Sequence, residues 1–196
     1  MKYDIVLSGV GGQGVLSVAA IIAQAAIDEG FRVRQSEVHG MAQRGGAVLA
    51  HLRIADREIA SDLVPKGCAD LILSMEPLES LRYAVWLSPG MADAPCGALV
   101  TASEPFINIP NYPDMDGIIK TIKSFPIHRI VEAAALAKEA GLARSVNMVM
   151  VGAASPFLPI GAETLQETIK KMFAHKDLKT VEANIKAFSL GRSAAK

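Results

Sequence analysis

Two glycine-containing segments near the N-terminus hold the residues best suited to chemistry. Residues 9–14 read GVGGQG and lie between an apolar run that predicts a strand and a longer apolar run that predicts a helix. Glycines let a backbone approach a diphosphate closely, and the N-terminus of the following helix presents unpaired N–H groups and a positive dipole. The segment predicts either a phosphate contact or a tight structural turn, with Gly11, Gly12, Gln13 and Gly14 as candidate binding residues.

The second segment is the loop at residues 38–46 (VHGMAQRGG), which carries two side chains able to meet an anion. Arg44 could place its guanidinium on a carboxylate or a phosphate. His39 could donate a hydrogen bond to an anion or move a proton. The alternatives are an arginine that only pins the loop and a histidine bonded to the backbone. We keep both residues as candidate binding residues.

No other pattern in the sequence indicates a catalytic or metal centre. His51 is interpreted as a packing residue on a strand, while His128 and His175 have no neighbours at metal-ligand spacing. Cys68 and Cys96 form no C-x-x-C pair and are interpreted as buried thiols. Neither a G-x-S-x-G elbow nor a P-loop is present. We therefore predict no catalytic and no metal-binding residue in this chain.

The spacing G-x-G-x-x-G within residues 9–14 also matches the dinucleotide-binding fingerprint. Glu37 ends the second predicted strand, near where a ribose-binding carboxylate belongs. However, no helix fits between the strands predicted at residues 31–37 and 47–54, and a dinucleotide-binding half needs one there. A free-standing NAD(P)-dependent dehydrogenase is therefore the alternative, not the first hypothesis.

The elements that must position these segments alternate between strands and helices. Strands are predicted at residues 3–8, 31–37, 47–54, 69–74, 98–102 and 127–131, with a short strand near 58–60. Helices are predicted at residues 15–29, 76–83, 114–123, 132–140 and 146–154, and two amphipathic helices include 165–173 and 178–188. Without a crossover helix, the second and third strands should pair antiparallel. We expect an α/β, Rossmann-like three-layer sandwich with a mixed, mainly parallel sheet and a helical C-terminal part.

Two segments are predicted to be irregular. Five of the ten prolines lie between Pro89 and Pro113, which predicts an extended excursion around the strand at residues 98–102. From Gly191 onward, the chain is predicted to be a frayed tail.

Length, composition and charge exclude several classes of protein. With 196 residues, 51% of them hydrophobic, the chain has material for one sizeable core and is not intrinsically disordered. Twenty basic and twenty acidic residues give no bulk attraction to nucleic acid or to an anionic membrane. The longest apolar stretch is too short for a membrane span and the N-terminus is not a signal sequence, so we expect a cytoplasmic protein.

Taken together, residues 11–14 (GGQG) and 36–46 (SEVHGMAQRGG) resemble the gamma-type domain of pyruvate/ketoisovalerate ferredoxin oxidoreductases. The HGMAQRGG form is most similar to the beta subunits of indolepyruvate ferredoxin oxidoreductases. Supporting stretches are SMEPLE at 74–79, NIPNYP at 108–113 and VNM at 146–148. The similarity covers almost the whole chain, so residues 1–196 are expected to form a single gamma-type domain.

The resemblance implies an oxidative decarboxylation carried out by a complex. An aryl pyruvate such as indolepyruvate would lose CO2 on thiamine diphosphate, electrons would pass through iron–sulfur clusters to ferredoxin, and coenzyme A would take the acyl group. It also implies a larger alpha subunit that carries thiamine diphosphate, Mg²⁺ and the clusters. Each cluster needs about four cysteine ligands, and this chain has two cysteines.

This chain would then be the smaller subunit, which binds no cofactor tightly and is inactive alone. We expect no nucleic-acid or membrane partner, and the isolated chain could pair with itself as a homo-dimer. Because the two glycine-containing loops follow neighbouring strands, they are predicted to meet at one rim of the sheet. There the backbone amides and Arg44 would contact a phosphate of coenzyme A or another anionic cofactor group. Alternatively, both loops only dock the subunits, and the chain is purely an assembly module.

Overall fold

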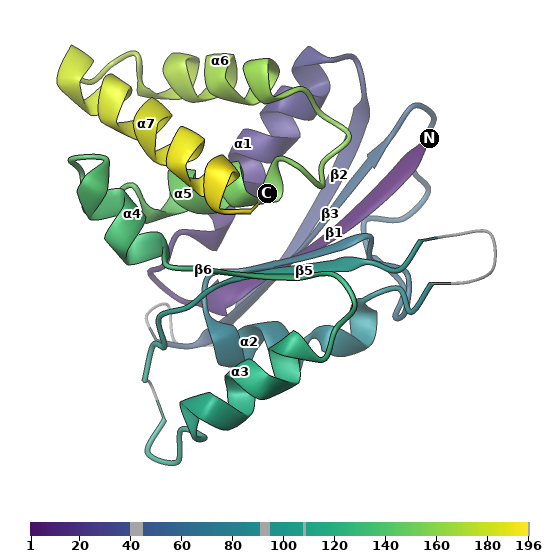
Figure 1. Cartoon of the computed structure of the whole chain (residues 1–196). Helices are drawn as coiled ribbons and strands as arrows, with labels where there is room; N and C mark the ends of the chain where they lie inside the picture. Colours follow the sequence, from purple (N-terminus) through teal and green to yellow (C-terminus); the bar gives the residue numbers. More distant parts are fainter. Residues whose placement is uncertain (40–44, 91–94, 108, 196) are drawn as a thin grey trace.

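The computed structural model describes residues 1–39, 45–90, 95–107 and 109–195, and for His39 the backbone only. Its centre is a six-stranded sheet in the order β2-β3-β1-β4-β5-β6 (Figure 1). The strands are β1 (Lys2–Val10), β2 (Arg32–His39), β3 (Ala47–Ala55), β4 (Leu71–Ser74), β5 (Ala98–Ala102) and β6 (His128–Val131). β1, β4, β5 and β6 run parallel, whereas β3 is antiparallel to both β1 and β2. The mixed, mainly parallel sheet and the antiparallel second and third strands are thus confirmed.

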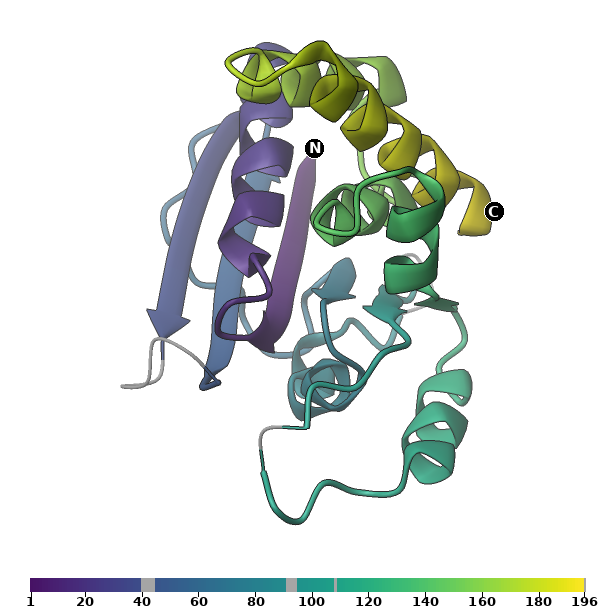
Figure 2. The same cartoon turned by 90° about the vertical axis from the view of Figure 1, so that its left-hand side faces the viewer.

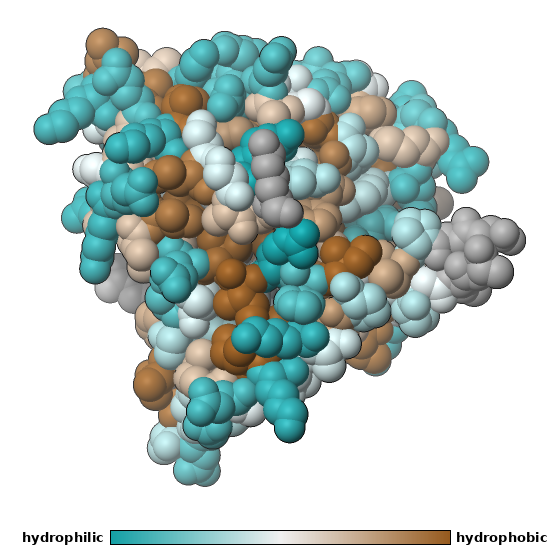
Figure 3. Space-filling model, viewed as in Figure 1, coloured by the Kyte–Doolittle hydropathy of each residue, from teal (hydrophilic) through white to brown (hydrophobic). Residues whose placement is uncertain are grey.

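Helices cover both faces of this sheet, which confirms the three-layer sandwich (Figure 1). One face carries α1 (Val15–Asp28), α4 (Ala133–Glu139), α5 (Val146–Ala154), α6 (Ala162–Phe173) and α7 (Leu178–Ala194). The opposite face carries α2 (Pro77–Arg82), which is followed by the short 3-10 helix η1 (Ala84–Trp86), and α3 (Met115–Lys123). Figure 3 shows hydrophilic residues over much of the outer surface, with apolar residues exposed between them. No helix within the described ranges is long and apolar enough to cross a membrane.

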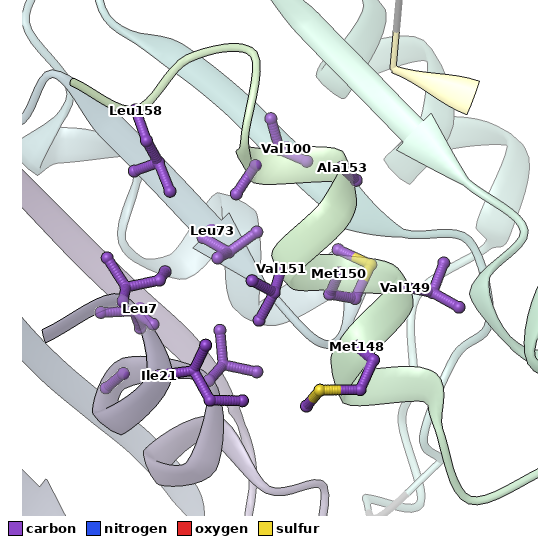
Figure 4. Packing of buried hydrophobic residues seen from close by; sticks show 14 of the residues in the cluster. Leu7, Ile21, Leu73, Val100, Met148, Val149, Met150, Val151, Ala153 and Leu158 are labelled. Atoms are coloured by element: carbon purple, nitrogen blue, oxygen red, sulfur yellow. The ribbon is translucent and has the colours of Figure 1, made fainter. Parts of the chain in front are cut away.

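The alternation of side chains along β1 divides the core in two. Ile5 and Leu7 join the larger apolar cluster under α1 and α5, and Val6 joins a smaller cluster with Ile118 and Ile122 of α3. Figure 4 shows α5 beside α1, with its Val151 close to Leu7 and Leu73 of the sheet. α5 is buried over most of its circumference, as its nearly continuous apolar sequence predicts.

The short strand predicted near residues 58–60 is wrong, because the described chain is irregular there. β3 is already paired with β1 on one edge and with β2 on the other, so a strand turning back after Ala55 would have no edge beside β3 to join. Instead, Arg53 holds the following loop by donating hydrogen bonds to the carbonyl oxygens of Ser61 and Leu63, at 3.0 and 3.1 Å.

The prediction of a frayed tail after Gly191 is also wrong, since α7 continues to Ala194. Gly191 is buried where α7 crosses α5, and a Cβ atom at this residue would lie 1.9 Å from the carbonyl oxygen of Val149. Gly152 of α5 has the reciprocal contact, because its Cβ would lie 2.0 Å from the carbonyl oxygen of Phe188. The absence of side chains at these two glycines lets the helices pack closely, and that packing orders the end of the chain.

The proline-rich excursion predicted between Pro89 and Pro113 is irregular on both sides of β5 in its described residues, and residues 91–94 and 108 lie outside them. We call residues 103–113 the arm; the structure describes all of it except residue 108. The arm leaves the C-terminal end of β5 and returns to the N-terminus of α3, extending beyond the edge of the sheet (Figure 2). It contains no helix or strand among its described residues.

Candidate functional site

The two glycine-containing loops meet at the carboxyl end of β1, as the sequence predicts. The backbone N–H of Gly11 donates to the carbonyl oxygen of Gly46 at 2.8 Å, and the backbone N–H of Gly45 donates to the carbonyl oxygen of Gly11 at 3.3 Å. The strands that precede the two loops are not neighbours, as the prediction assumed, because β3 lies between β1 and β2. The antiparallel pairing of β1 with β3 instead brings the end of β1 beside the start of β3, where the second loop ends. Arg44 and the side chain of His39 lie outside the described residues, so the structure does not place these two candidates.

The side chain of Gln13 fixes the shape of the first loop. Its Oε1 accepts a hydrogen bond from the N–H of Val10 at 2.8 Å, and its Nε2 donates to the carbonyl oxygen of Met75 at 3.2 Å. Gly12 and Gly14 have φ values of 99° and 79°, which favour glycine. The amide of Gln13 therefore ties the ends of β1 and β4 together, and the loop presents backbone to the surrounding space.

Two helices begin beside this loop, and neither has a side-chain cap. Gly14 is the N-cap of α1 and has no side chain to offer. Ser145 is the N-cap of α5, but its hydroxyl donates to the carbonyl oxygen of Leu142 at 2.7 Å instead. Asn147 in the first turn of α5 joins the two helix starts, because its Nδ2 lies 3.4 Å from the carbonyl oxygen of Gly14. The positive ends of two helix dipoles thus lie side by side.

A cleft of about 440 Å³ opens in front of these helix starts, at the carboxyl ends of β1, β4 and β5. Ligands of open α/β sheets commonly bind at such an edge. The glycine loop and the start of α5 form one wall, and Pro105 and Phe106 of the arm belong to another. A cleft of this size is in the range of small-molecule sites.

Two charged residues line the described part of the cleft, Glu104 and Arg144. Glu104 is already used within the protein, since its Oε1 accepts a hydrogen bond from the N–H of Ala134 at the start of α4, at 3.1 Å. The exposed guanidinium of Arg144 has no hydrogen-bond or ion-pair partner within the described part of the chain. The cleft therefore combines a free cation with two uncapped helix N-termini, an arrangement suited to an anion.

Sequence reasoning missed Arg144 and Glu104 as site residues. Asn147 drew attention only as part of a family motif, although a polar residue in the first turn of an apolar helix is itself a signal. Arg144 lies in the short connection that leads into α5, three residues before Asn147, where nothing local marks it. No group of three or more His, Cys, Asp or Glu side chains that could hold a metal ion occurs within the described ranges.

Comparison with known proteins agrees with this architecture. A model of the pyruvate ferredoxin/flavodoxin oxidoreductase family matches residues 4–194. An indolepyruvate oxidoreductase subunit IorB from Pyrococcus horikoshii is 38% identical over 205 residues, which covers 100% of this chain and 96% of that protein. Its counterpart from Thermococcus kodakarensis is 37% identical with the same coverage. More distantly, a 2-oxoglutarate synthase subunit KorC from Methanothermobacter marburgensis is 27% identical over 98% of this chain and 96% of its own length.

Solved structures share the fold at lower sequence identity. The 2-oxoglutarate:ferredoxin oxidoreductase of Magnetococcus marinus superposes with a TM-score of 0.76 at 22% identity, and the match covers 99% of this chain but 31% of that longer one. A keto/oxoacid ferredoxin oxidoreductase gamma subunit from Geobacter sulfurreducens gives a TM-score of 0.67 at 24% identity, with 98% of both chains covered. The resemblance inferred from the two glycine-containing loops is thus confirmed. By its full-length match and its fold, this chain belongs to the pyruvate ferredoxin/flavodoxin oxidoreductase family.

Proposed function

We propose that this chain is the smaller subunit of a 2-oxoacid:ferredoxin oxidoreductase that converts indolepyruvate or a related aryl pyruvate to an acyl-CoA. The observation that carries the proposal is the match of 36–38% identity over the full chain to indolepyruvate oxidoreductase subunits, against 24–28% to 2-oxoglutarate synthase subunits. The two cysteines are too few to ligate an iron–sulfur cluster, which supports a location of the clusters on a larger partner subunit. Thiamine diphosphate and Mg²⁺ are proposed for the same subunit from the family resemblance. Ferredoxin would be reached through that complex.

Within the complex, the cleft would contribute an anion-binding wall to an active site that the partner completes. Backbone N–H groups at the starts of α1 and α5, together with Arg144, would contact a phosphate of coenzyme A or another anionic cofactor group. Gly11, Gly12 and Gly14 would let that group approach the backbone, and Gln13 would hold the loop in shape. His39 and Arg44 remain candidates for the same wall, because their loop joins the glycine loop through Gly45 and Gly46.

A kinetic comparison in the assembled, anaerobically purified complex tests this role. Arg144→Ala removes the cleft cation that has no partner among the described residues, so the KM for coenzyme A should rise about tenfold or more while kcat changes little. Lys138→Ala is the matched control, since Lys138 is an exposed cation in the last turn of α4 outside the cleft lining. Arg44→Ala in the same assay tests the second loop.

Unchanged kinetics for coenzyme A and for the 2-oxoacid in both arginine variants of an intact complex would contradict the ligand role. The loops would then only dock the subunits. The dehydrogenase alternative has lost its structural basis, because β2 leads into the antiparallel β3 where a nicotinamide enzyme has a crossover helix. It would return only if the isolated chain bound NAD(P) in calorimetry.

Isolation of the tagged chain from its native cells under anoxic conditions tests the subunit assignment itself. We expect a larger partner with the visible absorption of iron–sulfur clusters, and activity with indolepyruvate in the eluate. A cytoplasmic location is part of the proposal, and the free thiols of Cys68 and Cys96 agree with a reducing compartment. If the isolated chain forms homo-dimers, two copies would associate through the surface that normally binds the larger subunit. The homo-dimers should therefore dissociate when the larger subunit is added.

A further inference from the structure

A buried carboxylate connects the sheet, a helix and the arm beside the cleft. Glu76 lies two residues after the end of β4 and is 1% exposed. Its Oε2 accepts a hydrogen bond from the N–H of Glu79 at 2.7 Å and thereby caps α2. Its Oε1 accepts hydrogen bonds from the N–H of Phe106, at 3.3 Å, and from the hydroxyl of Tyr112. One side chain therefore binds two points of the arm, near its two ends.

The position of Glu76 is itself fixed by the ends of two central strands. The hydroxyl of Ser74 donates to the carbonyl oxygen of Glu76 at 2.6 Å, and the N–H of Glu76 lies 3.3 Å from the same hydroxyl. Ser8 of β1 in turn donates to the hydroxyl of Ser74 at 2.9 Å. All three residues are buried. Because these hydrogen bonds hold Glu76 rigidly, Glu76 can define where the arm lies relative to the sheet.

At its start, the arm is also held by the N–H of Ser103, which donates to the carbonyl oxygen of Val131 at 2.8 Å, and by Glu104, which accepts from the N–H of Ala134. Beyond Glu104, it has little apolar packing to hold it. Its described residues form no helix or strand, and Phe106 and Ile107 are 42% and 71% exposed, so they bury little apolar surface. The ring of Tyr112 is partly buried against the smaller apolar cluster. Burial and the Glu76 carboxylate raise the pKa of the Tyr112 hydroxyl, so the phenol keeps its proton and donates. Beyond Glu104, polar contacts to Glu76 thus attach the arm at Phe106 and at Tyr112.

We propose that Glu76 is a positioning residue, which places Pro105 and Phe106 as the wall of the cleft by anchoring the arm through its carboxylate. The N–H of Phe106 is bonded directly to that carboxylate, and Phe106 itself lines the cleft. Only the identity of the ligand in the cleft rests on the proposed function. The placement of the arm by Glu76 stands independently of the ligand.

Hydrogen exchange of the full chain tests the anchor directly. Tyr112→Phe removes the hydroxyl donor and leaves the cap of α2 untouched, so exchange in the arm, including the N–H of Phe106, should accelerate at least about tenfold while α2 is unchanged. Tyr83→Phe is the matched control, because Tyr83 is also half-buried against the smaller cluster but lies outside the arm. Unchanged exchange in the arm of Tyr112→Phe would overturn the proposal.

Glu76→Asp distinguishes the two roles of the carboxylate, which caps α2 and binds the arm. Aspartate is a good N-cap, so α2 should keep its protection, but the shorter side chain should not reach the arm, whose exchange should accelerate as in Tyr112→Phe. Glu76→Gln keeps the length and loses the charge, and its amide nitrogen cannot accept a hydrogen bond. Both α2 and the arm should then exchange faster. Faster exchange confined to α2 in both variants would overturn the proposal.

Kinetics of the assembled complex distinguish positioning from mere local stability. Tyr112→Phe should raise the KM for coenzyme A about threefold with kcat nearly unchanged, and Tyr83→Phe should change neither. If Arg144→Ala raises this KM but Tyr112→Phe does not, the positioning proposal is wrong although the proposed function holds. If both variants leave the KM unchanged while the arm exchanges faster, the arm is anchored as proposed and the ligand role of the cleft is wrong.

Discussion

The two faces of the sheet are stabilised in different ways. On the face covered by α1 and α4 to α7, the strands contribute apolar side chains such as Ile5 and Leu7 to one large cluster. On the face covered by α2 and α3, the same strands contribute buried polar residues beside a smaller apolar cluster. These residues are Asp4, Ser8, His51, Ser74 and Thr101, and the buried Glu76 lies two residues after Ser74.

Buried polar residues of this face hold irregular segments at both ends of the strands. Near the amino end of β1, the buried carboxylate of Asp4 pairs with Arg53, whose guanidinium also donates to the loop after β3. Beyond the carboxyl end of β4, Glu76 accepts hydrogen bonds from the arm. Apolar packing cannot specify the path of an exposed loop, whereas directional hydrogen bonds from a buried group can. The apolar face therefore supplies most of the apolar packing, and the polar face positions the wall of the cleft that the arm forms.

The largest effect should come from crowding the helix crossing on the apolar face. Gly191→Val places side-chain atoms against the backbone of α5, where even a Cβ would lie 1.9 Å from the Val149 carbonyl oxygen. We expect the free energy of unfolding to fall by about 4 kcal/mol, measured by urea denaturation. Ser193→Val, at an exposed position of the same helix, should have little effect. A loss for Gly191→Val as small as that of the control would show that the crossing is loose.

A smaller effect is expected on the polar face from Arg53→Met. Among the described residues, the variant leaves the buried Asp4 with Lys2, at 2.7 Å, as its one ion-pair partner, and should lower the free energy of unfolding by about 3 kcal/mol. Replacing both partners, with Asp4→Leu added, should recover part of this loss because no buried charge then lacks a partner. Lys170→Met breaks an exposed pair with Glu167 and should change stability very little. A double variant less stable than Arg53→Met would contradict the expected coupling.

The smallest effect is a dependence of stability on pH that His51 of the polar face should contribute. Burial, with a smaller contribution from Arg53, lowers the pKa of His51 below its ordinary value of 6.5, although Asp62 and Asp4 oppose the shift. The unfolded chain therefore binds this proton more readily, so the His51 contribution is complete above pH 6.5 and is lost as the pH falls below it. Chemical denaturation from about pH 8 to pH 5.5 should show a flatter profile for His51→Gln than for the wild type. Parallel profiles would remove His51 as the cause.

Much of the fold could be predicted from the sequence because the signals are local. The alternating pattern of β1 (KYDIVLSGV) already separates an apolar face from a polar one. Because the sequence leaves no room for a crossover helix between the second and third strands, antiparallel pairing was expected, and β2 and β3 do pair in this way. The two glycine-containing loops met as predicted, because their strands end and begin at one edge.

The errors and omissions concern contacts between distant segments. The predicted strand near residues 58–60 failed because both edges of β3 were already occupied. The predicted tail is helical because Gly191 meets Val149, which is far away in the sequence. Arg144 and Glu76 were not recognised as parts of the site. The role of Arg144 depends on the start of α5 lying beside the glycine loop, and the role of Glu76 depends on the arm lying beside the end of β4. No local pattern contains those contacts.

The sequence by itself determined the strand and helix periods, the glycine turns and the family, since each depends on neighbouring residues or on a short motif. Only the tertiary structure decided how the cleft is built. It brought the starts of α1 and α5 together through Gly14 and Asn147, and it left Arg144 with no partner within the described residues. It also placed the arm where Glu76 accepts a hydrogen bond from it. The physical reason is that a buried hydrogen bond between segments thirty or more residues apart exists only once the core has packed around it.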